Sequence, residues 1–229
     1  MHLQIERNAK LFDIFLPAIK YNRNNNTDLV NDVKFYHLID GNIGYIFPQT
    51  LIDADFDIVK KKFKDTKGII IDMRCYPGTF MPYLYGAWLM PRSPFAIITA
   101  ASIDMPGLFE ITKPSINGSY SHSYNGRIVI IVNQETISQA EFTVMALSKV
   151  PGATVIGDTT AGADGDISTI VLPGGLLSWI SGIGIFYPDG TESQRLGVKI
   201  DHFIAPTIAG VRQRRDEQLE YAIKLINGK

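Results

Sequence analysis

The chain has a single cysteine, Cys75, among its 229 residues. One cysteine excludes a disulfide within the chain and any zinc cluster built on cysteine ligands. No apolar run approaches the roughly 20 residues that a helix needs to cross a bilayer, so we expect no membrane insertion. The first ten residues, MHLQIERNAK, carry charge where a signal peptide would be apolar, so we expect no signal peptide.

The chain also lacks an imbalance of charge. It has 22 Lys and Arg against 23 Asp and Glu, which gives a formal charge of −1. A nearly neutral chain without a basic run is not expected to bind nucleic acid or an anionic membrane as its main partner. Apolar residues make up 45% of the sequence, which is enough for a sizeable core.

Short apolar strands alternate with amphipathic helices along most of the chain. This alternation predicts an α/β fold with a mostly parallel sheet. The expected strands are 42–47, 68–72, 95–100, 127–132 and 153–158, followed by a β-hairpin group over 168–187. The expected helices are 53–65, 83–90, 138–150 and 216–226.

The N-terminal part of the chain lacks the strand–helix alternation of the rest. Residues 2–7 and 11–16 predict two strands around a turn, and the Asn-rich stretch 21–28 predicts a linker. We therefore divide the chain into residues 1–32 and a main domain of residues 33–229. Within that domain, 101–126 predicts a long irregular loop of the kind that is functional or mobile.

The stretch NQETISQAEFTVMAL, residues 133–147, joins a buried strand to a helix that begins near Ser138. The positive end of a helix stabilises an oxyanion, so a serine there, with the N–H of Gln139 beside it, fits a nucleophile. The same residues fit a capping box, in which Ser138 and Glu141 satisfy the first turn. The stretch by itself leaves both interpretations open.

A second strand ends in DMRCYPGTF, residues 72–80. Asp72 and Arg74 lie two residues apart, so in a strand their side chains share a face and can brace the loop. Gly78 permits a close approach of the backbone to a ligand. An ordinary Pro-Gly turn is the alternative explanation. A third stretch, YPDGTESQRLGVKID over 187–201, indicates only a turn, a loop and a strand.

Taken together, these stretches resemble the catalytic core of the C-terminal-processing (tail-specific) serine proteases, in particular their tricorn-core-like branch. The motifs IGYI, D-x-R-x-x-P-G, T-x-S-x-x-E, VIG-x-x-T-x-G and G-V-x-x-D and a terminal helix follow in the family's order over 34–226. The resemblance implies a ClpP/crotonase-type spiral core. It also implies that residues 1–17 close a PDZ-like domain, whose end and linker would be residues 1–32.

The resemblance also implies roles for individual residues. Ser138 falls on the nucleophile position, and the N–H of Gln139 and the backbone around Gly78 fall on the oxyanion hole. The implied substrate is a polypeptide or a peptide C-terminus, with no metal or cofactor. The implied location is the bacterial envelope or periplasm. Tyr76 and Thr79 stand where the family usually has Asn and Gly.

The general base is where the sequence departs from the family. In the processing proteases a lysine serves, and Ala163 occupies its position. Lys149 lies about 16 Å along the helix from Ser138, beyond hydrogen-bond reach. A Ser/Lys dyad is therefore not expected.

The tricorn-like branch instead uses a histidine from a segment before the PDZ-like region, and we expect that histidine to lie outside these 229 residues. His2, His37 and His202 do not match its motif, and His122, in a loop, is the first alternative. The branch orients its histidine with a Glu, whose position Gln194 occupies, and Glu192 is a possible substitute.

Three functions follow from this pattern. The first is a serine peptidase core acting through an acyl-enzyme on Ser138, with very low activity in this chain because the base is missing. The second is a peptide-binding or scaffold module of the same fold without turnover. The third is a crotonase-like acyl-thioester enzyme, which shares paired backbone donors but for which no acidic residue is clearly placed.

Overall fold

The computed structural model describes residues 1–17, 36–102, 104–119 and 124–228, and the chain divides into two units, residues 1–33 and 34–229. The predicted linker at 21–28 and His122 lie outside the described residues. Within the described ranges, no helix has the length and hydrophobicity required to cross a lipid bilayer.

The described part of the first unit is a β-hairpin. β1 (His2–Arg7) pairs antiparallel with β2 (Lys10–Phe15), as the sequence predicts. The two turn residues, Asn8 and Ala9, have φ of 52° and 58°, which is the backbone conformation of a type I′ hairpin turn. The relation of this hairpin to a PDZ-like domain stays a prediction.

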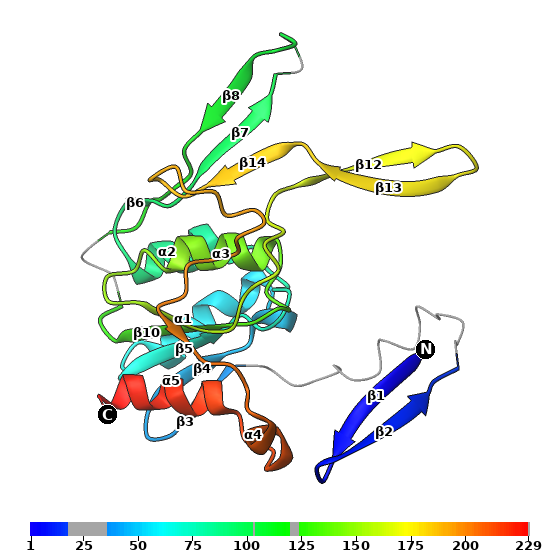
Figure 1. The fold of residues 1–229 in the computed structure, drawn as a ribbon. Coiled ribbons are helices and arrows are strands. Elements are labelled where there is room, and N and C mark those ends of the chain that lie inside the picture. The colour runs from blue at the N-terminus through cyan, green and yellow to red at the C-terminus, as the bar shows by residue number, and fades with distance from the viewer. Residues whose placement is uncertain (18–35, 103, 120–123, 229) are drawn as a thin grey trace. The chain divides into compact units, whose positions relative to one another are not determined.

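The second unit is built on a six-stranded sheet in the order β15-β11-β10-β5-β4-β3 (Figure 1). Only β3 and β4 pair antiparallel in this sheet, so the expected α/β fold with a mainly parallel sheet is confirmed. The strands are β3 (Tyr36–Ile39), β4 (Ile43–Ile46), β5 (Gly68–Asp72), β10 (Arg127–Val132), β11 (Thr154–Gly157) and β15 (His202–Phe203).

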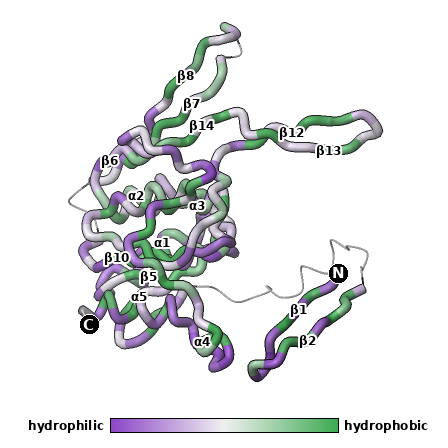
Figure 2. The backbone as a smooth tube through the Cα atoms, viewed as in Figure 1, coloured by the Kyte–Doolittle hydropathy of each residue, from purple (hydrophilic) through white to green (hydrophobic). Residues whose placement is uncertain are grey.

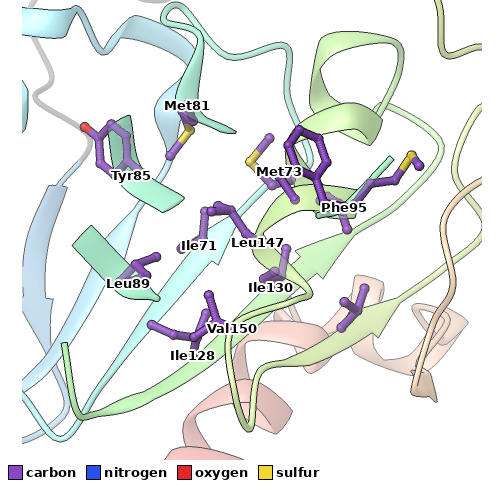
Figure 3. Packing of buried hydrophobic residues seen from close by; sticks show 14 of the residues in the cluster. Ile71, Met73, Met81, Tyr85, Leu89, Phe95, Ile128, Ile130, Leu147 and Val150 are labelled. Carbon is purple, nitrogen blue, oxygen red and sulfur yellow. The ribbon is translucent and has the colours of Figure 1, made fainter. Parts of the chain in front are cut away.

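Helices cover both faces of this sheet. They are α1 (Phe56–Phe63), α2 (Met81–Leu89), α3 (Gln139–Leu147), α4 (Ile208–Arg212) and α5 (Glu217–Asn227), and short 3-10 turns span Pro48–Thr50 and Asp53–Asp55. Successive strand residues point to opposite faces, which divides the core into two clusters. Ile71 and Ile130 pack with Leu147 of α3 (Figure 3), whereas Ile70 and Ile131 pack on the α5 side. Burial of each such isoleucine contributes roughly 2 kcal/mol.

Smaller strand pairs extend from this core. β7 (Ile97–Ala101) pairs with β8 (Phe109–Thr112) and β14 (Ile183–Phe186), β6 (Ser93–Pro94) pairs with β9 (Ser115–Ile116), and β12 (Ile167–Leu172) pairs with β13 (Leu176–Ser181). Figure 2, coloured by hydropathy, shows hydrophobic residues along the β12–β13 hairpin.

The prediction of an irregular loop over 101–126 is wrong in part, because β8 and β9 lie within that range. The four residues of β8, FEIT, alternate apolar and polar side chains as a strand does. They are too few to identify a strand without the partner that β7 provides.

Candidate active site

The loops that follow β5, β10 and β11 meet at one edge of the sheet. These strands are neighbours and parallel, and their registers pair Ile131 with Asp72 and Val132 with Gly157. Carboxyl ends of adjacent parallel strands form the usual place for a ligand in an open α/β sheet. The stretches 73–80, 133–138 and 158–166 are thereby brought together, although they are far apart in the sequence.

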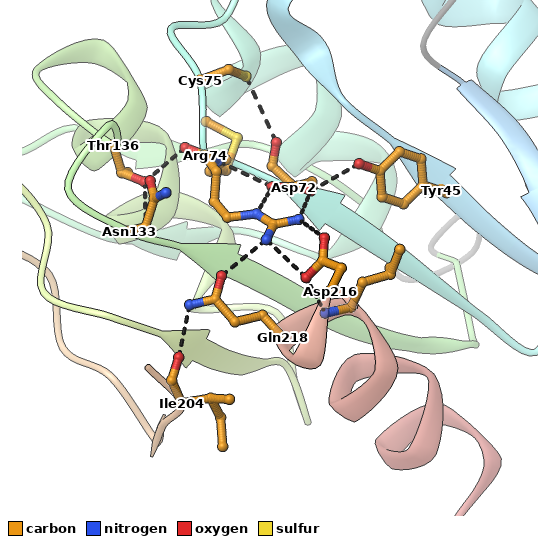
Figure 4. A network of polar contacts seen from close by, with 11 residues as sticks. Tyr45, Asp72, Arg74, Cys75, Asn133, Thr136, Ile204, Asp216 and Gln218 are labelled. Carbon is orange, nitrogen blue, oxygen red and sulfur yellow. Dashed lines mark hydrogen bonds and ion pairs between the residues drawn. The ribbon is translucent and has the colours of Figure 1, made fainter. Parts of the chain in front are cut away.

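An ion-pair network fixes the loop after β5 (Figure 4). The Arg74 guanidinium donates to both carboxylate oxygens of Asp72, at 2.9 and 2.6 Å, and to both of Asp216, at 3.0 and 2.6 Å. Asp72 is 1% exposed and also accepts from the Tyr45 hydroxyl at 2.8 Å. Burial, with the Asp72 charge adding to it, raises the pKa of Tyr45, which keeps that donor protonated. Asp72 and Arg74 therefore tie the sheet edge to α5, whose first turn Asp216 caps.

The turn after β10 is tied to the same loop. Thr136 donates its hydroxyl to the Met73 carbonyl at 2.7 Å and accepts the Asn133 N–H at 3.1 Å (Figure 4). Thr136 is fully buried. This threonine, the first residue of the T-x-S-x-x-E motif, therefore holds the approach to Ser138 in a fixed position.

Ser138 begins α3 in a strained backbone conformation, with φ 54° and ψ −119°. Residues other than glycine adopt such conformations at a cost of about 1–3 kcal/mol, and strain of this kind clusters at functional sites. The Ser138 N–H donates to Glu141 Oε2 at 3.2 Å, and the Ser138 carbonyl accepts from Phe142 at 3.0 Å. The Ser138 hydroxyl makes no side-chain cap hydrogen bond to the helix. A sharp strand-to-helix turn of this type presents a nucleophile in other hydrolases.

This strain gives a prediction for stability. We expect Ser138→Gly to be more stable than Ser138→Ala by about 1 kcal/mol, because only glycine adopts this backbone conformation without strain. Urea denaturation of the two variants measures the difference. Equal stability of the two variants would mean that the turn is not strained.

Glu141 connects Ser138 to the loop after β11. Its side chain is fully buried in α3 and accepts from the N–H groups of Gly162 at 2.7 Å and Ala163 at 2.9 Å and from the Thr160 hydroxyl at 2.6 Å. With the Ser138 N–H, four donors converge on one carboxylate. Glu141 thus holds the 160–163 segment against the start of α3.

A pocket of about 260 Å³ opens beside Ser138. Its walls are mainly apolar and aromatic, with two acidic residues among them. It is lined by Tyr76, Phe80, Ile98, Ser138, Gln139, Phe142, Asp164, Gly165, Asp166, Ile183 and Ile185. Phe80 stacks on Phe142, with ring centroids 6.1 Å apart.

Asp164, which the motif comparison does not single out, lies in this pocket and is 6% exposed. Its Oδ1 accepts the Gly165 N–H at 2.8 Å, and its Oδ2 has no hydrogen-bond partner within the described residues. Burial raises the pKa of Asp164 to about 7; the Gly165 N–H opposes the shift and the Glu141 charge adds to it. The available signal was an acidic residue directly after Ala163, in the stretch where the family has its lysine.

The two expected oxyanion donors differ in availability. Among the described residues, the Gln139 N–H has no acceptor, and the Gln139 side chain donates to the Thr79 carbonyl at 2.8 Å. The Gly78 N–H instead donates to the Pro48 carbonyl at 2.9 Å. A Cβ at Gly78 would lie 2.7 Å from the Leu51 carbonyl oxygen, so close packing requires glycine there.

Gln194 and Glu192 both have partners of their own. The Gln194 amide donates to the carbonyls of Asp164 at 2.9 Å and Ile183 at 3.0 Å, and its oxygen accepts the Ile185 N–H at 3.3 Å. Glu192 forms an ion pair with Arg195, at 2.8 and 2.9 Å. Gln194 therefore joins the Asp164 loop to β14.

The pocket walls contain no histidine and no lysine among the described residues. The His37 ring lies beside that of Tyr45, and His202 lies beside Tyr221. Lys149 lies with its ammonium 5.9 Å from the ring centroid of Tyr187. No group of three or more His, Cys, Asp or Glu side chains in the described part could hold a metal ion.

With the fold and this edge of the sheet described, sequence comparison identifies the family, which is one of peptidases. The profile of Peptidase family S41 matches residues 42–204, which is more than half of the chain. The chain therefore belongs to peptidase family S41. The comparison with curated proteins finds no match.

Solved structures share the fold at low identity. A protein of Parabacteroides merdae described as a peptidase is 20% identical, with a TM-score of 0.71 over 89% of this chain and 68% of its own. Mature CPAF is 15% identical, with a TM-score of 0.63 over 82% and 52%. The photosystem II D1 C-terminal processing protease is 20% identical, with a TM-score of 0.54 over 75% and 45%. The chain thus spans 45 to 68% of the length of these three structures.

Proposed function

We propose that this chain is the core of a serine peptidase in which Ser138 is the nucleophile. The observation that carries the proposal is the conformation of Ser138. Ser138 has φ 54° at the start of α3 and lines the pocket together with Gln139, whose N–H has no acceptor among the described residues. The substrate is a polypeptide, cleaved within the chain or near its C-terminus.

In this mechanism the Ser138 oxygen attacks the carbonyl carbon of a peptide bond. A C–O bond forms, the hydroxyl proton passes to a base, and the carbonyl oxygen becomes an oxyanion. The Gln139 N–H and the positive end of α3 stabilise that charge, and the Gly78 N–H would join them only after release from the Pro48 carbonyl. Collapse breaks the C–N bond, the amine leaves with a proton, and water then hydrolyses the acyl-enzyme.

The apolar walls of the pocket suit a substrate side chain. Phe80, Phe142 and Ile185 offer the kind of surface that binds an aliphatic or aromatic group. Bound there, the side chain would bring its own carbonyl beside Ser138. We therefore assign this pocket to substrate side-chain recognition.

A peptide-binding module without turnover is the second candidate. It is favoured by Ala163, which stands in place of the lysine, and by Gln194, whose amide and oxygen are engaged by backbone groups. Such a module would keep the groove and the pocket but leave Ser138 unreactive.

Labelling with a serine-directed fluorophosphonate probe separates the two candidates. We expect the wild-type chain to be labelled and Ser138→Ala to lose labelling, because only an activated serine reacts. Ser148→Ala is the matched control, since Ser148 lies at the other end of α3 with its hydroxyl bonded to the Met145 carbonyl. Labelling that survives in Ser138→Ala would overturn the assignment, and a wild-type chain that binds peptides without labelling would favour the binding module.

A further inference from the structure

Asp164 lines the Ser138 pocket and carries a buried carboxylate oxygen that accepts no hydrogen bond from the described residues. An unpaired buried oxygen costs stability, so Oδ2, which has no partner in the part of the chain that the structure describes, calls for a role. We propose that the Asp164 carboxylate accepts the Ser138 hydroxyl proton through one water and so acts as the general base of this site. The inference rests on the proposed function, because it supplies the step that Ser138 needs.

The geometry brings Asp164 to Ser138 through a shared partner. Glu141 Oε2 accepts the N–H of Ser138 at 3.2 Å and that of Ala163 at 2.9 Å. Two nitrogens that donate to one oxygen at these distances lie at most about 6 Å apart. Asp164 directly follows Ala163, and both Asp164 and Ser138 line the same pocket. Asp164 Oδ2 makes no hydrogen bond to the Ser138 hydroxyl within the described residues, so the proton would pass through a water held between them in the pocket.

The Asp164 side chain is held in place from two sides. The Gly165 N–H occupies Oδ1 at 2.8 Å, and Oδ2 accepts no hydrogen bond from the residues that the structure describes. The Gln194 amide holds the Asp164 carbonyl at 2.9 Å. Gln194, which the resemblance suggests as an orienter of a histidine, would in this arrangement position Asp164 instead.

The charges around Asp164 suit a base that works near neutral pH. Glu141 of α3 and Asp166 of the same loop bring negative charge, and Tyr76 and Tyr187 are the neighbouring phenols. No lysine or arginine lines the pocket in the described residues. Burial and the Glu141 charge raise the pKa of Asp164 to about 7, although the hydrogen bond from the Gly165 N–H acts to lower it. General bases are most effective when their pKa is near the working pH.

The proton balance is complete within the site. The ionised Asp164 takes the proton as the Ser138 oxygen bonds to the carbonyl carbon, and the neutral Asp164 returns it to the amine nitrogen as the C–N bond breaks. In deacylation the same carboxylate takes a proton from water and returns it to Ser138. No co-reactant besides water is needed.

The test is the pH dependence of fluorophosphonate labelling in the wild type, Asp164→Asn and Asp158→Asn. We expect wild-type labelling to rise about tenfold per pH unit below pH 7 and then level off. Asp164→Asn should be labelled at least about 100-fold more slowly, at a rate that no longer follows this curve. Asp158→Asn is the matched control, because Asp158 also accepts the N–H of the next residue, Thr159, but does not line the pocket. It should behave as the wild type.

Thermal unfolding distinguishes a lost base from a lost fold. Because folding raises the pKa of Asp164, the wild type should lose stability as pH rises from about 4 to about 7. The Asp164→Asn variant lacks this loss of stability. The difference in melting temperature, variant minus wild type, should therefore be larger at pH 8 than at pH 5. A folded Asp164→Asn that is not labelled supports the proposal.

Two results would overturn the inference while leaving the proposed function in place. One is Ser138-dependent labelling that survives in Asp164→Asn, and the other is a wild-type rate independent of pH between 5 and 8. Absence of Ser138-dependent labelling in the wild type at every pH would remove both proposals.

Discussion

Replacement of Arg74 with alanine is expected to destabilise the chain by about 3–5 kcal/mol. The variant leaves the Asp72 carboxylate, 1% exposed, without the guanidinium that donates to both of its oxygens. Removal of one partner of a buried ion pair carries a penalty of this size, because the remaining charge is neither solvated nor paired. Urea denaturation, followed by circular dichroism, measures the change in the free energy of unfolding.

Two further variants test the reason for this effect. Arg92→Ala removes an exposed arginine and should change stability by less than about 0.5 kcal/mol. The double variant Asp72→Asn/Arg74→Met removes both charges and should be more stable than Arg74→Ala, since the carboxylate that still loses its guanidinium, Asp216, is partly exposed rather than buried. If the free energy of unfolding of Arg74→Ala lay within about 1 kcal/mol of the wild-type value, the Tyr45 hydroxyl and solvent would be enough to stabilise the Asp72 carboxylate.

Replacement of Glu141 with glutamine is expected to cost about 2–4 kcal/mol and to reduce Ser138 labelling at least tenfold. The carboxylate accepts from Ser138, Ala163, Gly162 and Thr160. A glutamine presents an NH₂ to two of these donors whichever way its amide turns, and buried donors without acceptors are costly. The loss of labelling follows because Glu141 holds Ser138 and the Asp164 loop together.

Glu135→Gln is the matched control for this prediction. Glu135 lies in the turn before Ser138 and its side chain is exposed, so the same chemical change there should be nearly neutral. Unfolding in urea and labelling at pH 8 are measured on both variants. Equal behaviour of Glu141→Gln and Glu135→Gln would contradict the role of Glu141 as the link between the two loops.

Local sequence was sufficient for most of the sheet. The strands GIIID and RIVIIV are apolar along their whole length because helices cover both faces, and such runs are recognisable without knowledge of their partners. The β12–β13 hairpin is recognisable for a related reason, since its strands flank the turn residues Pro173, Gly174 and Gly175. Short elements were missed: β9 has two residues and β8 four, too few for a periodic pattern.

The sequence also identified the motif residues, but it did not predict all of the contacts that they make. Asp72 and Arg74 do contact each other, as their spacing predicts, yet their link to Asp216 spans 142 residues. The N–H of Gly78 is bound by Pro48, and the amide of Gln194 is bound by backbone carbonyls. Hydrogen-bond partners so distant along the chain are set by how the loops pack.

The sequence by itself thus determined the α/β alternation, the parallel sheet and the position of Ser138, because each depends on side chains close together in the chain. Only the tertiary structure placed Asp164 in the Ser138 pocket with a buried oxygen that has no partner among the described residues. Its burial depends on walls from β7, α3 and β14, and its proximity to Ser138 depends on the carboxylate of Glu141. The raised pKa of Asp164 is a property of that assembled environment and not of the residue or its neighbours in the chain.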